Sequence, residues 1–168
     1  MANIKLIEQQ DAQAYYDFHV EMSKQTDYLL LTQDEVGALT VDDYKKVVDR
    51  SLNLERNIVF VAKDEDKIMG AIWVQGFKVS KMKHIACFGI GVLKQYQNQS
   101  IASQLYRQAE LYLKCNGVEK VQITVIDENT QACKFYEKLG FEVEGELKKS
   151  VYMNNKYYNE IQLAKFIL

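Results

Sequence analysis

The chain has 168 residues, of which 48% are hydrophobic and 26% charged. This length fits a single domain spanning residues 1–168, and the composition is that of a globular protein, which argues against intrinsic disorder. The 21 basic and 23 acidic residues give a net charge of −2, so no excess positive charge exists to neutralise a nucleic-acid backbone.

The sequence also argues against membrane and metal-binding classes. No apolar run approaches the roughly 20 residues that span a bilayer, and the first residues lack the basic and apolar segments of a signal peptide. We therefore expect a cytoplasmic protein with neither a membrane nor a nucleic acid as a partner. Cys87, Cys115 and Cys133 form an odd, widely spaced set, and only two histidines are present. This pattern predicts reduced thiols and no metal site.

The hydrophobic periodicity predicts an α/β chain. After the first strand come two helices, separated by an irregular segment at residues 26–37, and then a β-hairpin. The second helix opens with Thr40 and Asp43 spaced as in a capping box. A helix joins the fourth strand to the fifth, which is the connection that parallel pairing requires. We predict strands at residues 3–8, 57–63, 68–76, 84–92, 119–126, 141–147 and 156–168, and helices at residues 11–24, from Thr40 onward, at 101–114 and at 129–139.

A polar loop at residues 93–100 separates the fourth strand from the next helix. Three consecutive amide side chains, at residues 97–99, and the small residues at 100, 102 and 103 allow a diphosphate to approach the backbone. The first turn of a helix offers unpaired N–H groups and a positive dipole end to an anion. The loop lacks the glycine-rich fingerprints of dinucleotide and nucleoside triphosphate sites. An ordinary connection remains the alternative to phosphate binding.

Two motifs in this region resemble the GNAT superfamily of N-acetyltransferases. Gln97-x-x-Ser100-x-Ala102 is similar to the acetyl-CoA loop of that superfamily, Gln/Arg-x-x-Gly-x-Gly/Ala. The next helix of the superfamily carries a second pattern, which matches without a gap. Its residues here are Asn129, Ala132, Tyr136, Gly140 and Phe141.

The resemblance is specific over roughly residues 84–146 and looser elsewhere. Within the superfamily the chain is most similar to the ribosomal-protein-alanine and polyamine acetyltransferase branch. The residues that carry this likeness are Gly140-Phe141-x-x-Glu144-Gly145 and the later Tyr157-Tyr158-Asn159-Glu160.

The resemblance implies an α/β, GNAT-like fold: a mixed, mostly antiparallel central sheet of six to seven strands, flanked by helices on both faces, with a parallel pair splayed at the cofactor site. It implies acetyl transfer from acetyl-CoA to a primary amine by direct attack in a ternary complex. The acceptor would be a protein N-terminus, a polyamine or another small amine, and a homodimer is left open. The implied coenzyme-binding residues are Ile90, Val92, Gln97, Asn98, Gln99, Ser100, Ile101, Ala102 and Asn129.

Ser100 is the main departure from the pattern, because it stands where the family has glycine. If this position requires a positive φ, a residue with a β-carbon costs about 1 kcal/mol or more. Alternatively, Ser100 caps the helix with its hydroxyl group. Gln97 replaces the more common arginine and removes a charge, so we expect weakened coenzyme binding. Ser100 and the lack of an obvious base also motivate a second hypothesis, a noncatalytic acyl-CoA-binding regulatory module on the same fold.

Acetyl transfer requires a proton donor and stabilisation of negative charge on the acetyl oxygen. In similar enzymes a tyrosine at the position of Tyr136 protonates the coenzyme sulfur; the alternative is that Tyr136 only packs beside Phe135. The family uses a main-chain N–H of the preceding strand for the oxygen, here within residues 90–92. Gly91 in that segment also allows a bulge that splays the strands.

The base is open between two candidates. His84 begins the fourth strand, and histidine has a reference pKa of about 6.5 that suits proton transfer; the alternative is a surface or capping residue. Glu35 lies in the segment that lines the acceptor site in similar proteins, where a carboxylate either accepts a proton or binds a cationic amine. A solvated loop residue is the alternative for Glu35.

Overall fold

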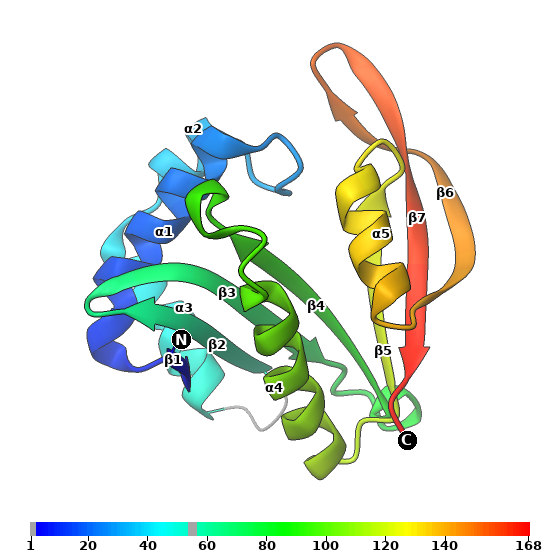
Figure 1. Cartoon of the computed structure of the whole chain (residues 1–168), viewed down its shortest axis with the longest axis horizontal. Coiled ribbons are helices and arrows are strands. Elements are labelled where there is room, and N and C mark those ends of the chain that lie inside the picture. The colour runs from blue at the N-terminus through cyan, green and yellow to red at the C-terminus, as the bar shows by residue number, and fades with distance from the viewer. Residues whose placement is uncertain (1–2, 54–56) are drawn as a thin grey trace.

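A seven-stranded sheet in the order β1-β2-β3-β4-β5-β7-β6 lies at the centre of the computed structural model, which describes residues 3–53 and 57–168 (Figure 1). The strands are β1 (Asn3–Leu6), β2 (Asn57–Asp64), β3 (Lys67–Gly76), β4 (Ile85–Val92), β5 (Lys120–Ile126), β6 (Glu142–Met153) and β7 (Lys156–Phe166). The α-helices are α1 (Ala12–Gln25), α2 (Gln33–Gly37), α3 (Val41–Asn53), α4 (Ile101–Cys115) and α5 (Thr130–Lys138). Short 3-10 helices are η1 (Gln9–Asp11), η2 (Ser80–Met82) and η3 (Lys94–Tyr96).

The predicted element order is confirmed, with two differences. A capping box between Thr32 and Glu35 forms the five-residue helix α2 inside the segment predicted to be irregular, where one turn is too short to leave a periodic pattern. β6 extends six residues beyond residue 147, where the prediction ended it. A register shift between Leu147 and Val151 interrupts the alternation there, so the sequence pattern is lost although the strand continues.

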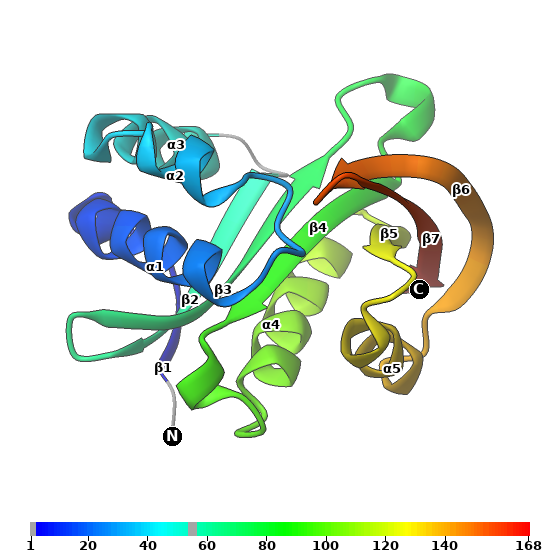
Figure 2. The same cartoon turned by 90° about the horizontal axis from the view of Figure 1, so that it is seen from above.

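Helices cover both faces of the sheet, as predicted. Figure 2 shows α1, α2 and α3 on one face and α4 and α5 on the other. The alternation of β4 separates the two layers. Ala86, Phe88 and Val92 pack with α4 and α5 in one core cluster, whereas Gly89 and Gly91 face the α1 layer. None of the described helices combines the length and apolar character needed to cross a membrane.

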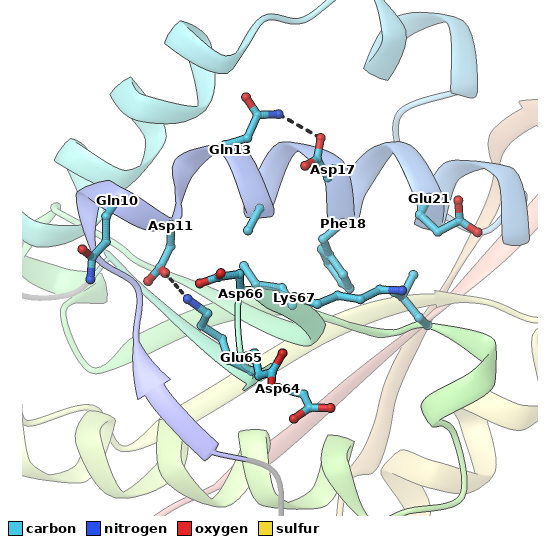
Figure 3. Close-up of a pocket in the computed structure, with 14 residues that line it drawn as sticks. Gln10, Asp11, Gln13, Asp17, Phe18, Glu21, Asp64, Glu65, Asp66 and Lys67 are labelled. Atoms are coloured by element: carbon cyan, nitrogen blue, oxygen red, sulfur yellow. Dashed lines mark hydrogen bonds and ion pairs between the residues drawn. The ribbon is translucent and has the colours of Figure 1, made fainter.

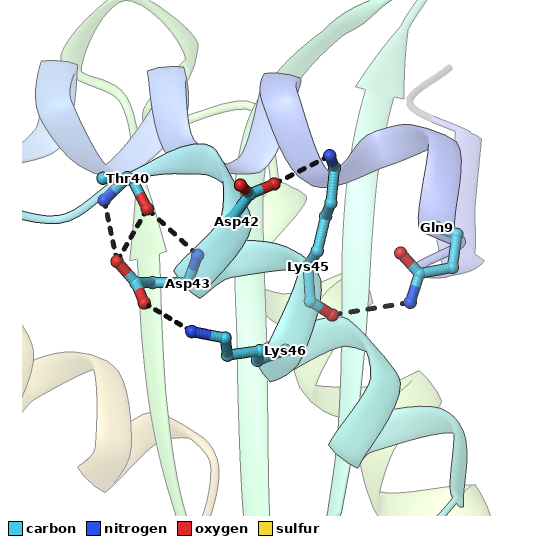
Figure 4. A network of polar contacts seen from close by, with 6 residues as sticks. All are labelled: Gln9, Thr40, Asp42, Asp43, Lys45 and Lys46. Atoms are coloured by element: carbon cyan, nitrogen blue, oxygen red, sulfur yellow. Dashed lines mark hydrogen bonds and ion pairs between the residues drawn. The ribbon is translucent and has the colours of Figure 1, made fainter.

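The start of α3 confirms the predicted capping box (Figure 4). The N–H and the hydroxyl of Thr40 donate to Asp43 Oδ2 at 3.1 and 2.8 Å, and the N–H of Asp43 donates to Thr40 Oγ1 at 3.3 Å. These bonds lower the pKa of Asp43 to about 2. Gln9 donates to the carbonyl of Lys45 at 3.4 Å, which fixes α3 against η1. The residues at the helix start therefore set where the α3 layer begins.

β4 and β5 form the parallel pair, and they stay together over only three residue pairs. The pairing runs from Ile85↔Lys120 to Cys87↔Gln122. Beyond it, β4 continues beside β3 and β5 continues beside β7, so the two strands part (Figure 1). We call the parted segments, residues 88–92 of β4 and 123–126 of β5, the split. Gln122 Nε2 donates to Cys87 Sγ at 3.5 Å and marks its closed end.

The bulge that Gly91 would allow is not formed. The β3–β4 register runs from Gly70↔Val92 to Gly76↔Ala86 without a shift. Gly91 instead leaves room for the α1 layer, because a Cβ at this position would lie 3.0 Å from Met22 Cε. Divergence of β4 and β5 after their third pair, rather than a bulge, therefore makes the split.

Candidate functional site

The loop between η3 and α4 has a backbone shaped to receive an anion. Asn98 and Ser100 both have φ of 60°, and such left-handed turns make consecutive N–H groups converge. The Ser100 hydroxyl makes no capping bond, so the alternative in which it caps α4 is not realised. The first bond of the helix runs from the N–H of Gln104 to the carbonyl of Ser100, at 3.0 Å. The earlier N–H groups of this turn therefore have no intrahelical acceptor.

Gln97 ties this loop to its surroundings. Its backbone N–H donates to the carbonyl of Lys94 at 3.2 Å, and its Nε2 donates to the carbonyl of Val92 at 3.1 Å. Its Oε1 accepts a bond from Gln131 Nε2 on α5 at 3.4 Å. Gln97 therefore connects the end of β4, the loop and the start of α5.

Asn129 begins α5. Its Oδ1 accepts the N–H of Ala132 at 3.2 Å, and its carbonyl accepts the N–H of Cys133 at 3.1 Å. The side chain is therefore the N-cap of α5, half-buried beside the split. Capping fixes the first turn of α5 next to the Gln97 loop.

Tyr136 lies on the α5 side of the split, and its ring is buried. It is 4% exposed and packs edge to face against Phe88 of β4, at 5.8 Å between ring centroids. Burial raises the pKa of Tyr136, so its phenol stays protonated. The ring therefore belongs to the core between α5 and β4.

Ile90 and Val92 supply the free edge of β4. Both continue to pair with β3 on one side, at Ile72↔Ile90 and Gly70↔Val92, while their β5 side is unpaired. Alternate main-chain N–H and C=O groups of residues 88–92 therefore point into the split. They can bond an extended, amide-containing arm that lies alongside β4.

The structure does not bring His84 to this place. His84 is exposed and precedes β4, where its carbonyl accepts the N–H groups of Glu119 and Lys120 at 2.9 and 3.0 Å. It therefore lies beyond the closed end of the split, which the contact between Gln122 and Cys87 marks. Six residues of extended chain separate it from Ile90, about 20 Å.

Glu35 is part of a helix cap. Its Oε2 accepts both the N–H and the hydroxyl of Thr32, at 2.8 and 2.9 Å, and these bonds lower the pKa of Glu35. The carboxylate is exposed and stays ionised at neutral pH. The segment between α1 and α2 that precedes it passes over β4 (Figure 2).

Two glutamines of the site were missed by the sequence reasoning. Gln131 reaches Gln97, and Gln25 at the end of α1 accepts the N–H of Lys94 at 2.8 Å. Neither belongs to a motif, and both contacts join segments far apart in the sequence. Only their placement in the fold identifies them.

A separate cavity of about 600 Å³ lies between α1 and the turn that joins β2 to β3 (Figure 3). Its lining takes no residue from α4, β5 or α5, so it is distinct from the split. Asp11 on its wall is buried, and burial opposes ionisation. Bonds from Lys63 and Lys5, at 2.6 and 3.2 Å, nevertheless hold the pKa of Asp11 below its ordinary value.

Sequence comparison relates the chain to acetyltransferases. The family model described as acetyltransferase (GNAT) family matches residues 24–141. L-amino acid N-acetyltransferase AaaT of Escherichia coli (strain K12) is 32% identical over 108 residues, which are 62% of this chain and 65% of that protein. Spermidine N(1)-acetyltransferase of the same strain is 31% identical over 94 residues, 55% of this chain and 50% of that protein. The chain thus spans less than two thirds of the length of both curated relatives.

Solved structures share the fold over the whole chain. An acetyltransferase of the GNAT family from Streptococcus pneumoniae has a TM-score of 0.93 at 24% identity, covering 99% of each chain. YncA of Salmonella typhimurium, solved with its cofactor acetyl-CoA, has a TM-score of 0.86 at 11% identity, covering 100% of this chain and 95% of that one. At these identities the likeness concerns the fold. The family model spans more than half of the sequence, and the chain belongs to the acetyltransferase (GNAT) family.

Proposed function

We propose that the protein transfers the acetyl group of acetyl-CoA to a primary amine of a small molecule. One observation carries the proposal: the uncapped start of α4 and the ring of Tyr136 lie on the two sides of the same split between β4 and β5. The names of the curated relatives support a small amine as acceptor, since one acts on L-amino acids and the other on spermidine. A peptide N-terminus is the alternative acceptor.

The residues of the loop fit the coenzyme. The N–H groups of residues 98–102 would bond the diphosphate, and the edge of β4 at Ile90 and Val92 would bond the pantetheine arm. Asn129 fixes the first turn of α5 beside the arm. Gln97 acts through its bonds to Val92 and Gln131, which hold the loop in place.

Acetyl-CoA supplies the acetyl group as a thioester. The amine attacks directly in a ternary complex: a nitrogen–carbon bond forms and the carbon–sulfur bond breaks. A main-chain N–H of residues 90–92 stabilises the negative charge that develops on the acetyl oxygen. Tyr136 donates its hydroxyl proton to the leaving sulfur and later regains a proton from water. Its raised pKa keeps the phenol protonated but makes it a weaker acid, so the transfer depends on the hydroxyl lying close to the sulfur.

The amine must lose a proton, and we propose that water takes it. His84 lies at the other end of β4, and Glu35, with its lowered pKa, is a weak base. As an exposed, ionised carboxylate on α2, Glu35 is better suited to attract a cationic amine than to deprotonate it. That neither His84 nor Glu35 is suited to act as the base also favours the second candidate, a noncatalytic acyl-CoA-binding module.

Release of free coenzyme A, followed with a thiol reagent over a panel of L-amino acids, spermidine and a short peptide, tests the proposal. Turnover is expected with at least one amine, and Tyr136→Phe should lower kcat by about 10²-fold or more while coenzyme binding is kept. Tyr16→Phe on α1 is the matched control and should behave as wild type. Tight coenzyme binding without turnover on any amine would favour the module. No binding of coenzyme A at all would overturn both.

A further inference from the structure

Two helices begin at the open end of the split, one on each side. α4 starts at Ile101 on the β4 side and α5 starts at Thr130 on the β5 side. The bond from Gln131 Nε2 to Gln97 Oε1, at 3.4 Å, joins the first turn of α5 to the loop before α4. The positive dipole ends of both helices therefore meet at one polar loop.

The same bond is the last step of a chain of contacts across the split. Gln97 holds the carbonyl of Val92 with its Nε2, at 3.1 Å, and Gln131 with its Oε1. The contact between Gln122 and Cys87 marks the closed end, and the pair Gln97–Gln131 spans the open end. An arm that lies along β4 and continues to the start of α4 must pass this pair.

The loop between η3 and α4 has no basic side chain of its own, so the Gln97–Gln131 pair matters for binding a diphosphate there. Residues 95–103 contain no lysine or arginine, so helix ends and amide groups must offset the charge of a bound diphosphate. Asn129 uses its Oδ1 to cap α5. Gln131, exposed in the first turn of α5, presents its amide N–H groups to the loop instead.

We infer that Gln131 is a coenzyme-binding residue: its amide, held beside the loop by Gln97, donates to the phosphate to which the pantetheine arm is attached. The inference rests on the proposed function, because it needs the coenzyme to lie in the split. It assigns the binding of the coenzyme's phosphate to both helix starts, where the family resemblance assigned it to the loop before α4 alone.

Calorimetry with coenzyme A tests this on the wild type, Gln131→Ala and a control, Gln108→Ala, which removes an exposed amide from α4. Gln131→Ala should raise the Kd for coenzyme A about tenfold, the effect of one hydrogen bond to a charged group. Gln131→Glu should raise it further through repulsion. Gln108→Ala should match the wild type. Binding of pantetheine, which lacks the phosphates, should be the same in the wild type and Gln131→Ala.

The outcomes separate this inference from the proposed function. If the wild type binds coenzyme A and Gln131→Ala binds it equally well, the inference is overturned and the proposed function stands. If pantetheine and coenzyme A lose equal affinity, Gln131 does not act on the phosphates, and the inference is again overturned. If the wild type binds no coenzyme A, both fail. Equal melting temperatures of the variants without coenzyme exclude a folding defect as the cause.

Discussion

The ring of Tyr136 on α5 meets the ring of Phe88 on β4 at 5.8 Å, with an angle of 76° between their planes. The two residues belong to opposite sides of the split, so this edge-to-face contact sets how far α5 stands from β4. Tyr136 therefore depends on Phe88 for the position of its hydroxyl group.

Phe88→Ala should remove that support and leave a hole in the core. Phe88 is 8% exposed, and truncation of a buried phenylalanine costs about 3–5 kcal/mol of unfolding free energy. Phe88→Leu should cost less and is the informative variant. It should lower kcat more than it raises the KM for acetyl-CoA, because it displaces Tyr136, the proposed proton donor, and leaves the α4 loop intact. An unchanged kcat in Phe88→Leu would contradict this role.

Ser100→Gly should stabilise the protein. Ser100 has φ of 60° and ψ of 12°, a conformation that costs a residue with a β-carbon about 1 kcal/mol more than glycine. Chemical denaturation should show a gain of about that size, and the Kd for coenzyme A should fall as the loop backbone relaxes. Ser103→Gly, inside α4, should instead lower stability by about 0.5 kcal/mol. Loss of stability in Ser100→Gly would show that the serine hydroxyl is needed.

Gly89→Ala should disturb the α1 side of the split. A Cβ at Gly89 would lie 2.3 Å from the Trp73 ring, so the indole must move, at a cost of about 1–3 kcal/mol. Gly145→Ala is the control, since nothing lies within 4 Å of a Cβ there. We also expect a changed KM for the amine, since Trp73 covers the face of β4 away from α4. A melting temperature equal to that of Gly145→Ala would contradict the tight contact.

Acid should destabilise the protein partly through His19. Burial among Tyr15, Tyr44 and Trp73 lowers the pKa of His19 to about 4, although the bond to the Tyr15 carbonyl opposes this. A lowered folded-state pKa means that the stability is fully present above about pH 6.5 and is lost as the pH falls towards 4. Over that window wild type should lose about 2–3 kcal/mol more than His19→Gln. Parallel stability curves for the two proteins would contradict this.

His84→Ala should leave catalysis unchanged. The imidazole lies beyond the closed end of the split, about 20 Å from Ile90 by strand rise. The kcat and its dependence on pH should therefore match those of the wild type for every accepted amine. A large fall in kcat, rescued by added imidazole, would instead restore His84 as the base.

Local patterns predicted most of the fold and the outline of the site. The Thr40 capping box, the β2–β3 hairpin and the loop before α4 all depend on neighbours in sequence, and each was found. The parallel pair followed from the helix that connects β4 to β5. The family resemblance predicted that Tyr136 and this loop belong to one site. The packing of the Tyr136 ring on Phe88 places the ring beside the split.

The sequence could not predict which side chains would lie close together across the sheet. The strand pattern put His84 beside Ala86 and Phe88 but did not say which end of β4 would part from β5. Gly91 suggested a bulge, yet the space it leaves is used by Met22 of α1. Gln131 has no motif, and its contact with Gln97 exists only because α5 packs beside the loop. Each of these features depends on how two elements pack against each other. The periodicity of a single strand carries no information about that packing.

The brevity of the β4–β5 pairing has a consequence for ligand shape. Strands β1–β4 form one half of the sheet, and β5, β7 and β6 form the other. The two halves are joined only by the short β4–β5 pairing, so the sheet has an internal edge where a further strand would ordinarily run. A long, narrow ligand that contains amide groups can take the place of that strand and complete the hydrogen-bond ladder. By this reasoning a flexible coenzyme arm becomes, once bound, the element that unites the two halves of the sheet.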